Sequence, residues 1–102
     1  MDLRYKFNHR GLNSIISLGL IGYYPLFDRD WIGKIQEIGS KNLTVKEKQR
    51  VHKVINKLKK TEGLDKKRTI FSSQSEEDQI LFMKAFTDFI AGKKIDENME
   101  LH

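Results

Sequence analysis

The stretch TVKEKQRVHKVINKLKK, residues 44–60, decides the fold of this chain. It opens with Thr44, and Glu47 follows three residues later, which is the capping-box pattern at the start of a helix. Four aliphatic residues then recur at the spacing of one helical face: Val51, Val54, Ile55 and Leu58. The sequence therefore predicts an amphipathic helix here, ended by Gly63.

A second face of the same predicted helix is basic. At about 100° per residue, five side chains fall together on it: Lys46, Arg50, Lys53, Lys57 and Lys60. Three more basic residues follow in the next segment: Lys66, Lys67 and Arg68. From residue 41 to residue 68 the chain has eleven basic residues and three acids, whereas residues 76–102 have seven acids and three lysines. The net charge of +5 therefore understates a strong charge asymmetry.

The flanking segments predict three more helices and two short strands. The first helix is expected over residues 10–21. The second is expected over Trp31–Ile38, with Asp28 or Asp30 as its N-cap and Gly39 as its stop. The third is expected over residues 76–92, after a serine cap. Alternation in residues 3–7 predicts a strand, which would pair with a second strand near residues 68–71.

The predicted fold is mainly α: a compact four-helix single domain over residues 1–92, with one short two-stranded β pairing and a polar tail over 93–102. A winged-helix-like arrangement is the alternative, because a short helix, a glycine-containing turn and a longer basic helix have the order of a helix-turn-helix. The segment after the basic helix would then be the wing.

The composition excludes several classes of protein. The chain of 102 residues has no cysteine, which rules out disulfides and thiolate metal sites and favours a reducing, cytoplasmic compartment. Residues 11–24 are rich in Leu and Ile, but polar residues interrupt them and the stretch is too short to cross a bilayer. We therefore expect a buried helix there, with no integral membrane segment, in place of an anchor or a leader.

No residue pattern indicates catalysis, a metal or a cofactor. His9, His52 and His102 are scattered, without the spacing of metal ligands. Asp28 and Asp30 stand at a predicted helix start, where carboxylates usually act as caps. We expect no enzyme activity.

An aromatic segment is the second candidate site, for binding a protein partner. It contains Tyr23, Tyr24, Phe27 and Trp31. Exposed rings anchor partners or stack on bases, whereas the alternative is that these rings close one end of a small core.

The basic helix suggests a non-enzymatic nucleic-acid-associated or regulatory module that binds phosphates through the eight basic residues named above. Lysine contacts phosphates more than base edges, so such a surface would bind without reading sequence. The main alternative is a homodimeric protein-interaction adaptor with no nucleic-acid role, based on the apolar first and last helices. An acidic protein or an anionic membrane surface would suit the same charge.

Overall fold

The computed structural model describes residues 3–7, 9–27, 30–38 and 42–100. The helical segments are α1 (Leu3–Phe7), a 3₁₀ turn η1 (Arg10–Leu12), α2 (Asn13–Leu20), α3 (Trp31–Ile38), α4 (Val45–Lys59), α5 (Leu64–Ser73) and α6 (Glu76–Glu100). No strand occurs in these ranges. The predicted mainly α class and single compact domain are confirmed, and the Cα radius of gyration of 13.1 Å is that expected of a compact chain of this length.

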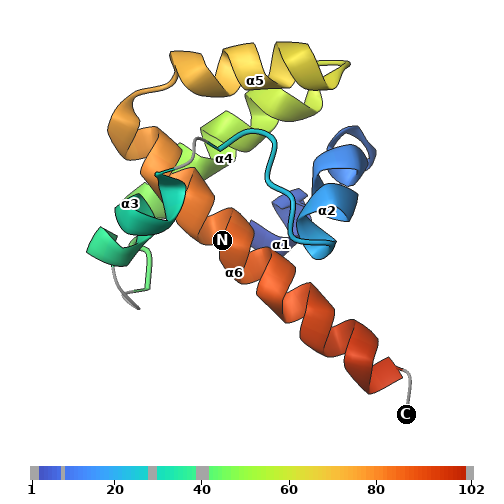
Figure 1. Cartoon of the computed structure of the whole chain (residues 1–102). Helices are drawn as coiled ribbons and strands as arrows, with labels where there is room; N and C mark the ends of the chain where they lie inside the picture. Colours follow the sequence, from blue (N-terminus) through green and yellow to red (C-terminus); the bar gives the residue numbers. More distant parts are fainter. Residues whose placement is uncertain (1–2, 8, 28–29, 39–41, 101–102) are drawn as a thin grey trace.

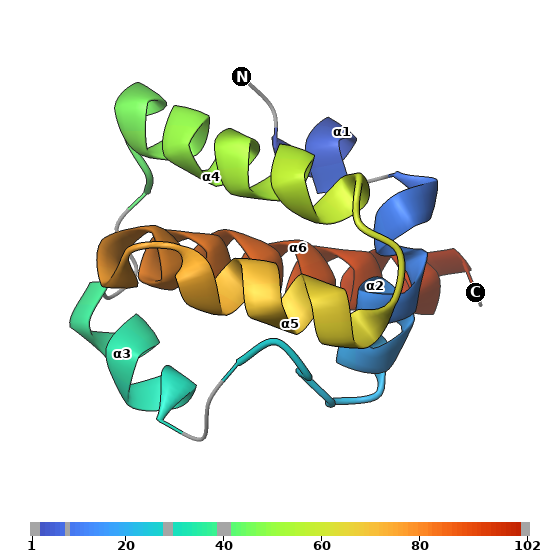
Figure 2. The same cartoon turned by 90° about the horizontal axis from the view of Figure 1, so that it is seen from above.

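Helix α6 is the centre of the fold. It runs through the middle of the molecule, and helices α1, α2, α3 and α4 all contact it (Figures 1 and 2). Its C-terminal end extends past the other helices. Ile95, on this extension, is 60% exposed. The last helix in the chain therefore holds together the elements that precede it.

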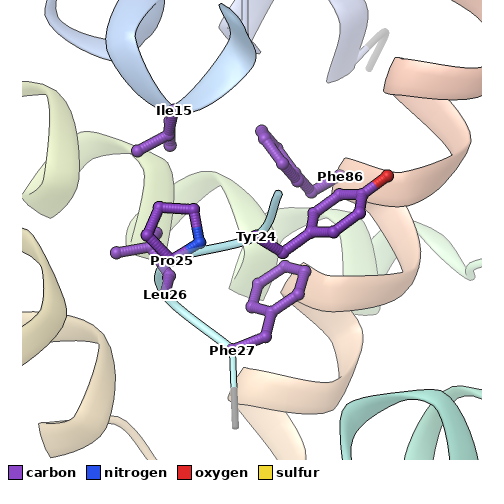
Figure 3. A pocket seen from close by; sticks show the side chains of 6 residues that line it. All are labelled: Ile15, Tyr24, Pro25, Leu26, Phe27 and Phe86. Carbon is purple, nitrogen blue, oxygen red and sulfur yellow. The ribbon is translucent and has the colours of Figure 1, made fainter. Parts of the chain in front are cut away.

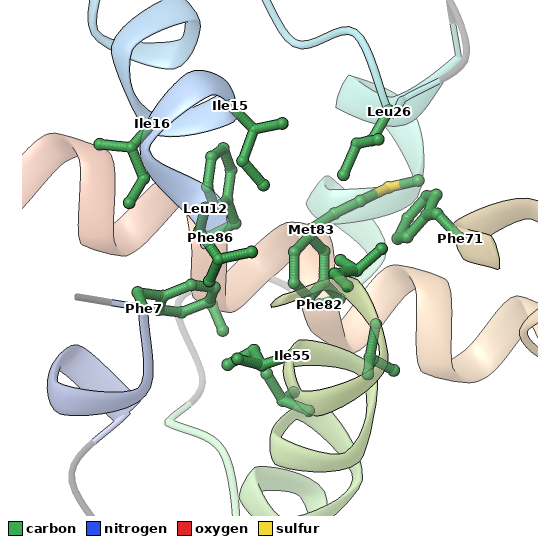
Figure 4. Packing of buried hydrophobic residues seen from close by; sticks show 14 of the residues in the cluster. Phe7, Leu12, Ile15, Ile16, Leu26, Ile55, Phe71, Phe82, Met83 and Phe86 are labelled. Atoms are coloured by element: carbon green, nitrogen blue, oxygen red, sulfur yellow. The ribbon is translucent and has the colours of Figure 1, made fainter. Parts of the chain in front are cut away.

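The core combines aliphatic side chains from α2 and α4 with aromatic side chains from α1, α5 and α6 (Figure 4). The ring of Phe7 lies 5.7 Å from that of Phe82 and 5.6 Å from that of Phe86, both edge-on. It also stacks on Phe89 at 5.2 Å. Each such ring pair adds to the stabilisation from apolar burial.

Helix α4 forms as predicted. Thr44 Oγ1 accepts a hydrogen bond from the Glu47 amide at 3.2 Å, and Glu47 Oε1 accepts one from the Thr44 amide at 2.8 Å. This closed capping box satisfies two amides that the first turn leaves without helical partners. The four aliphatic residues of the predicted apolar face are at most 1% exposed.

The predicted β pairing is wrong, because both expected strands are helices. In α1, Leu3 and Phe7 are four residues apart and turn to the same side, and Phe7 enters the core. In α5, Lys67 and Phe71 have the same spacing and are both buried. In segments this short, residues four apart fit one face of a strand as well as one face of a helix, so the pattern does not distinguish the two. Because the expected wing is α5, the winged-helix alternative is also wrong.

Two glycines behave in different ways. Gly92 does not end α6 as predicted, since the helix continues to Glu100. The division at residue 92 between a domain and a tail stays a prediction. Gly11 is needed for a close approach between η1 and the end of α4: a Cβ atom there would lie 2.4 Å from the Lys59 carbonyl oxygen. The predicted boundary residues Asp28 and Gly39 lie outside the described residues.

Candidate functional site

Helix α4 presents a row of lysines to solvent. Its cap and buried face fix the rotation of the helix, so that Lys46, Lys53, Lys57 and Lys60 are all exposed. The row extends about 21 Å along the helix axis, at 1.5 Å per residue. Within the described residues, none of these four side chains forms an ion pair with a carboxylate.

Arg50 lies in the same row but is held by two acids from the first turn of α6. Its Nη1 is 2.6 Å from Glu77 Oε1, and its Nε is 2.6 Å from Asp78 Oδ1. The hydrogen bond to Glu77 is the main cause that raises the pKa of Arg50, while desolvation acts in the opposite direction. This group carries one net negative charge between Lys46 and Lys53, so the predicted row of five free cations is interrupted.

Lys57 is positioned without being neutralised. Its Nζ donates a hydrogen bond to Gln74 Oε1 at 3.1 Å, across the contact between α4 and α5. Gln74 carries no charge, so this hydrogen bond does not pair the exposed ammonium of Lys57 with a carboxylate.

Lys67 does not belong to the surface. Its side chain is 3% exposed, and its Nζ donates to the carbonyl of Thr61, just after α4. Burial lowers the pKa of this amine, and the nearby Glu62 partly opposes that shift. The prediction that Lys67 contacts phosphates is therefore wrong, because the residue lies on the buried face of α5 with Phe71.

Lys66 and Arg68 are both exposed, but they point to different sides of α5. Two residues along a helix correspond to a rotation of about 200°, so the two side chains diverge. Lys66 lies one helical turn before Ile70, which is partly buried against the core. The two exposed cations of α5 therefore lie on different sides of that helix.

We call four of the exposed side chains the lysine patch: Lys53, Lys57 and Lys60, which follow one another at helical spacing on α4, and Lys66 in the first turn of α5. Lys46 is exposed but lies beyond the Arg50 group. All four residues of the patch are among the eight basic residues that the sequence suggests as phosphate contacts. Sequence reasoning missed Glu77, Asp78 and Gln74, which set the limits of the patch, because they come from helices whose packing against α4 has no local signal.

The aromatic segment mainly closes the core, as in the alternative considered from the sequence. The rings of Tyr24 and Phe27 stack at 5.6 Å, and Trp31 lies 4.9 Å from Tyr24. Phe27 also contacts Phe71 at 5.6 Å. Tyr23 differs, since it is 55% exposed. Only this last ring is free enough to act as a partner anchor.

A small hollow beside these rings is lined by Ile15, Tyr24, Pro25, Leu26, Phe27 and Phe86 (Figure 3). Its lining is apolar, and the space does not admit even a water molecule. The hollow is therefore a packing feature and not a binding site for a small molecule.

The lysine patch and the aromatic segment lie on different sides of the molecule. Seen from above, α4 is at one edge and the connection from α2 to α3 is at the other, with α5 and α6 between them (Figure 2). The two candidate sites from the sequence therefore do not form a single surface.

Other classes of site are not found among the described residues. No three His, Asp or Glu side chains there converge as metal ligands. None of the described helices combines the length and the apolar character needed to cross a bilayer. Comparison with protein-family models, curated proteins and solved structures gave no match.

Proposed function

We propose that this domain binds the phosphate backbone of nucleic acid through the lysine patch and has no catalytic role. One observation carries this proposal: three exposed lysines at helical spacing on α4, and the exposed Lys66 at the start of α5, have no carboxylate partner among the described residues. Uncompensated lysines on rigid helices are suited to phosphates, which supply most of the affinity in sequence-independent binding.

The salt dependence of binding tests the proposal. If all four lysines neutralise phosphates, the logarithm of the affinity for duplex DNA falls with the logarithm of salt with a slope of about −3.6. Between roughly 50 and 200 mM salt, the affinity then falls about 150-fold. Fluorescence anisotropy of a labelled duplex measures this directly.

A triple variant gives the matching genetic test. Replacement of Lys53, Lys57 and Lys60 by glutamine should reduce the slope by about 2.7. Arg68→Gln is the matched control, since it removes an exposed cation about 200° around α5 from Lys66, and it should leave affinity and slope nearly unchanged. Absence of binding at low salt, or equal loss in the control, contradicts the proposal.

A second candidate function is homodimerisation through the end of α2. Ile21 is 78% exposed and Tyr23 is 55% exposed, on either side of Gly22. Gly22 has a φ of +87°, which makes the chain turn sharply and presents both side chains to solvent. Light scattering of the wild type and of Ile21→Asp tests this candidate: a dimer that the substitution dissociates supports it, and a monomeric wild type excludes it.

A further inference from the structure

We infer that the lysine patch selects double-stranded over single-stranded nucleic acid, and that it does so chiefly through contacts with phosphates. This inference rests on the proposed function and specifies the ligand of the same site. Three features of the surface carry it: the position of the rings, the spacing of the lysines and the state of Arg50.

Among the side chains that the structure describes on α4 and α5, no exposed Phe, Tyr or Trp offers a surface on which an unpaired base can stack. Residues 44–60 contain no Phe, Tyr or Trp, and Phe71 of α5 is 1% exposed. The exposed Tyr23 belongs to the connection on the other side of the molecule (Figure 2). Proteins that bind single strands combine a basic groove with such rings, so this surface has only the electrostatic half of that design.

The spacing of the lysines along α4 favours a ligand with closely spaced negative charges. Lys53 and Lys60 are about 10.5 Å apart along the axis of α4, with Lys57 between them. A duplex presents about six phosphate charges over that length and a single strand about three. Each contact also releases more counterion from a duplex than from a single strand. Because the lysines of this surface attract phosphates through their charge, we expect the duplex to be the stronger ligand.

Of the three side chains of α4 best suited to read base edges, Arg50 and Asn56 are already engaged, whereas Gln49 is exposed. Arg50 is held by Glu77 and Asp78, so it cannot form the paired hydrogen bonds that recognise guanine. Asn56 lies 3.2 Å from the ring of His52, with its amide engaged there. The remaining lysines contact phosphates, which are the same in every sequence.

Affinities for one duplex DNA and for each of its separated strands, measured at low and at higher salt, test the inference. The duplex should bind several-fold more tightly at low salt. Its slope should be about −3.6, against about −2.8 for the strands, so its advantage should shrink about threefold between roughly 50 and 200 mM salt. A duplex RNA of the same sequence, measured in the same way, shows whether the patch prefers RNA or DNA. Tighter binding of either duplex than of its separated strands supports the inference.

Trp31 provides an independent readout, because it is the single tryptophan of the chain and it lies in the aromatic segment. Its fluorescence should not change when DNA occupies the patch. Equal or tighter binding of the single strand, or quenching of Trp31 by it, overturns the inference and leaves the proposed function intact. Failure of every nucleic acid to bind overturns the proposed function itself.

Discussion

Replacement of Gly11 by alanine should disrupt the contact between η1 and the end of α4. The new Cβ atom would lie 2.4 Å from the Lys59 carbonyl oxygen and 3.2 Å from His9 Nδ1, whereas real Cβ contacts are essentially never closer than 3.0 Å. The nearer atom belongs to the backbone, so one segment must move away by about 0.6 Å or more. Leu12, the next residue, is fully buried and would lose packing.

The expected cost follows from other cases of overpacking. Forcing an extra carbon into a packed interior costs about 1–3 kcal/mol. For a domain of this size, that corresponds to a fall in Tm of roughly 4–20 °C. Urea denaturation followed by circular dichroism measures the change in the free energy of unfolding.

Gly33→Ala is the matched control. Gly33 lies within α3, and a Cβ atom there would have no neighbour within 4 Å. Alanine is the better helix former, so this variant should gain about 0.5–1 kcal/mol. If Gly11→Ala is as stable as the wild type, or gains as much as Gly33→Ala, the close packing of η1 on α4 is wrong.

Three more predictions follow from the contacts of α4. Thr44→Ala should lower stability to urea by about 1 kcal/mol, and Thr44→Ser should largely restore it, because the hydroxyl closes the capping box with Glu47. For Lys67, burial makes the pKa lower in the folded than in the unfolded state. The unfolded state therefore holds more protons at alkaline pH, so the free energy of unfolding rises with pH there. Urea denaturation at pH values of roughly 7 to 10 should show this rise relative to Lys67→Met, and equal pH profiles of the two proteins would contradict it. Glu77→Gln removes a negative charge beside Arg50 and should tighten DNA binding about two- to fivefold at low salt, whereas weaker binding would show that the ion pair is needed.

The sequence was sufficient to predict α4, because several local signals agree there. The cap, the apolar spacing and the basic face all indicate the same helix, and burial of Val51 and Leu58 follows that pattern. The predicted bounds of the helix at Trp31–Ile38 also match α3. Where local signals agree in this way, tertiary contacts do not have to correct them.

The errors occur where local signals are short or ambiguous. Leu3, Tyr5 and Phe7 alternate as in a strand, but Leu3 and Phe7 also fit one side of a helical turn, and packing of Phe7 on α6 decides between the two. From its residue type, Lys67 is expected at the surface. Only the packing of α5 shows that its side chain is buried. The loss of Arg50 from the candidate site depends on α6 lying beside α4, which no local pattern encodes.

The central position of α6 has a consequence for how this chain acquires its structure. Helical proteins usually fold fast because most of their contacts are close in sequence. Here the ring of Phe7 packs on Phe82, Phe86 and Phe89, near the other end of the chain. During synthesis, helices α1 to α4 therefore leave the ribosome before α6, the helix on which they pack. Until α6 is made, their apolar faces have no partner from that helix. We therefore expect the core to form cooperatively, and only after α6 has left the ribosome.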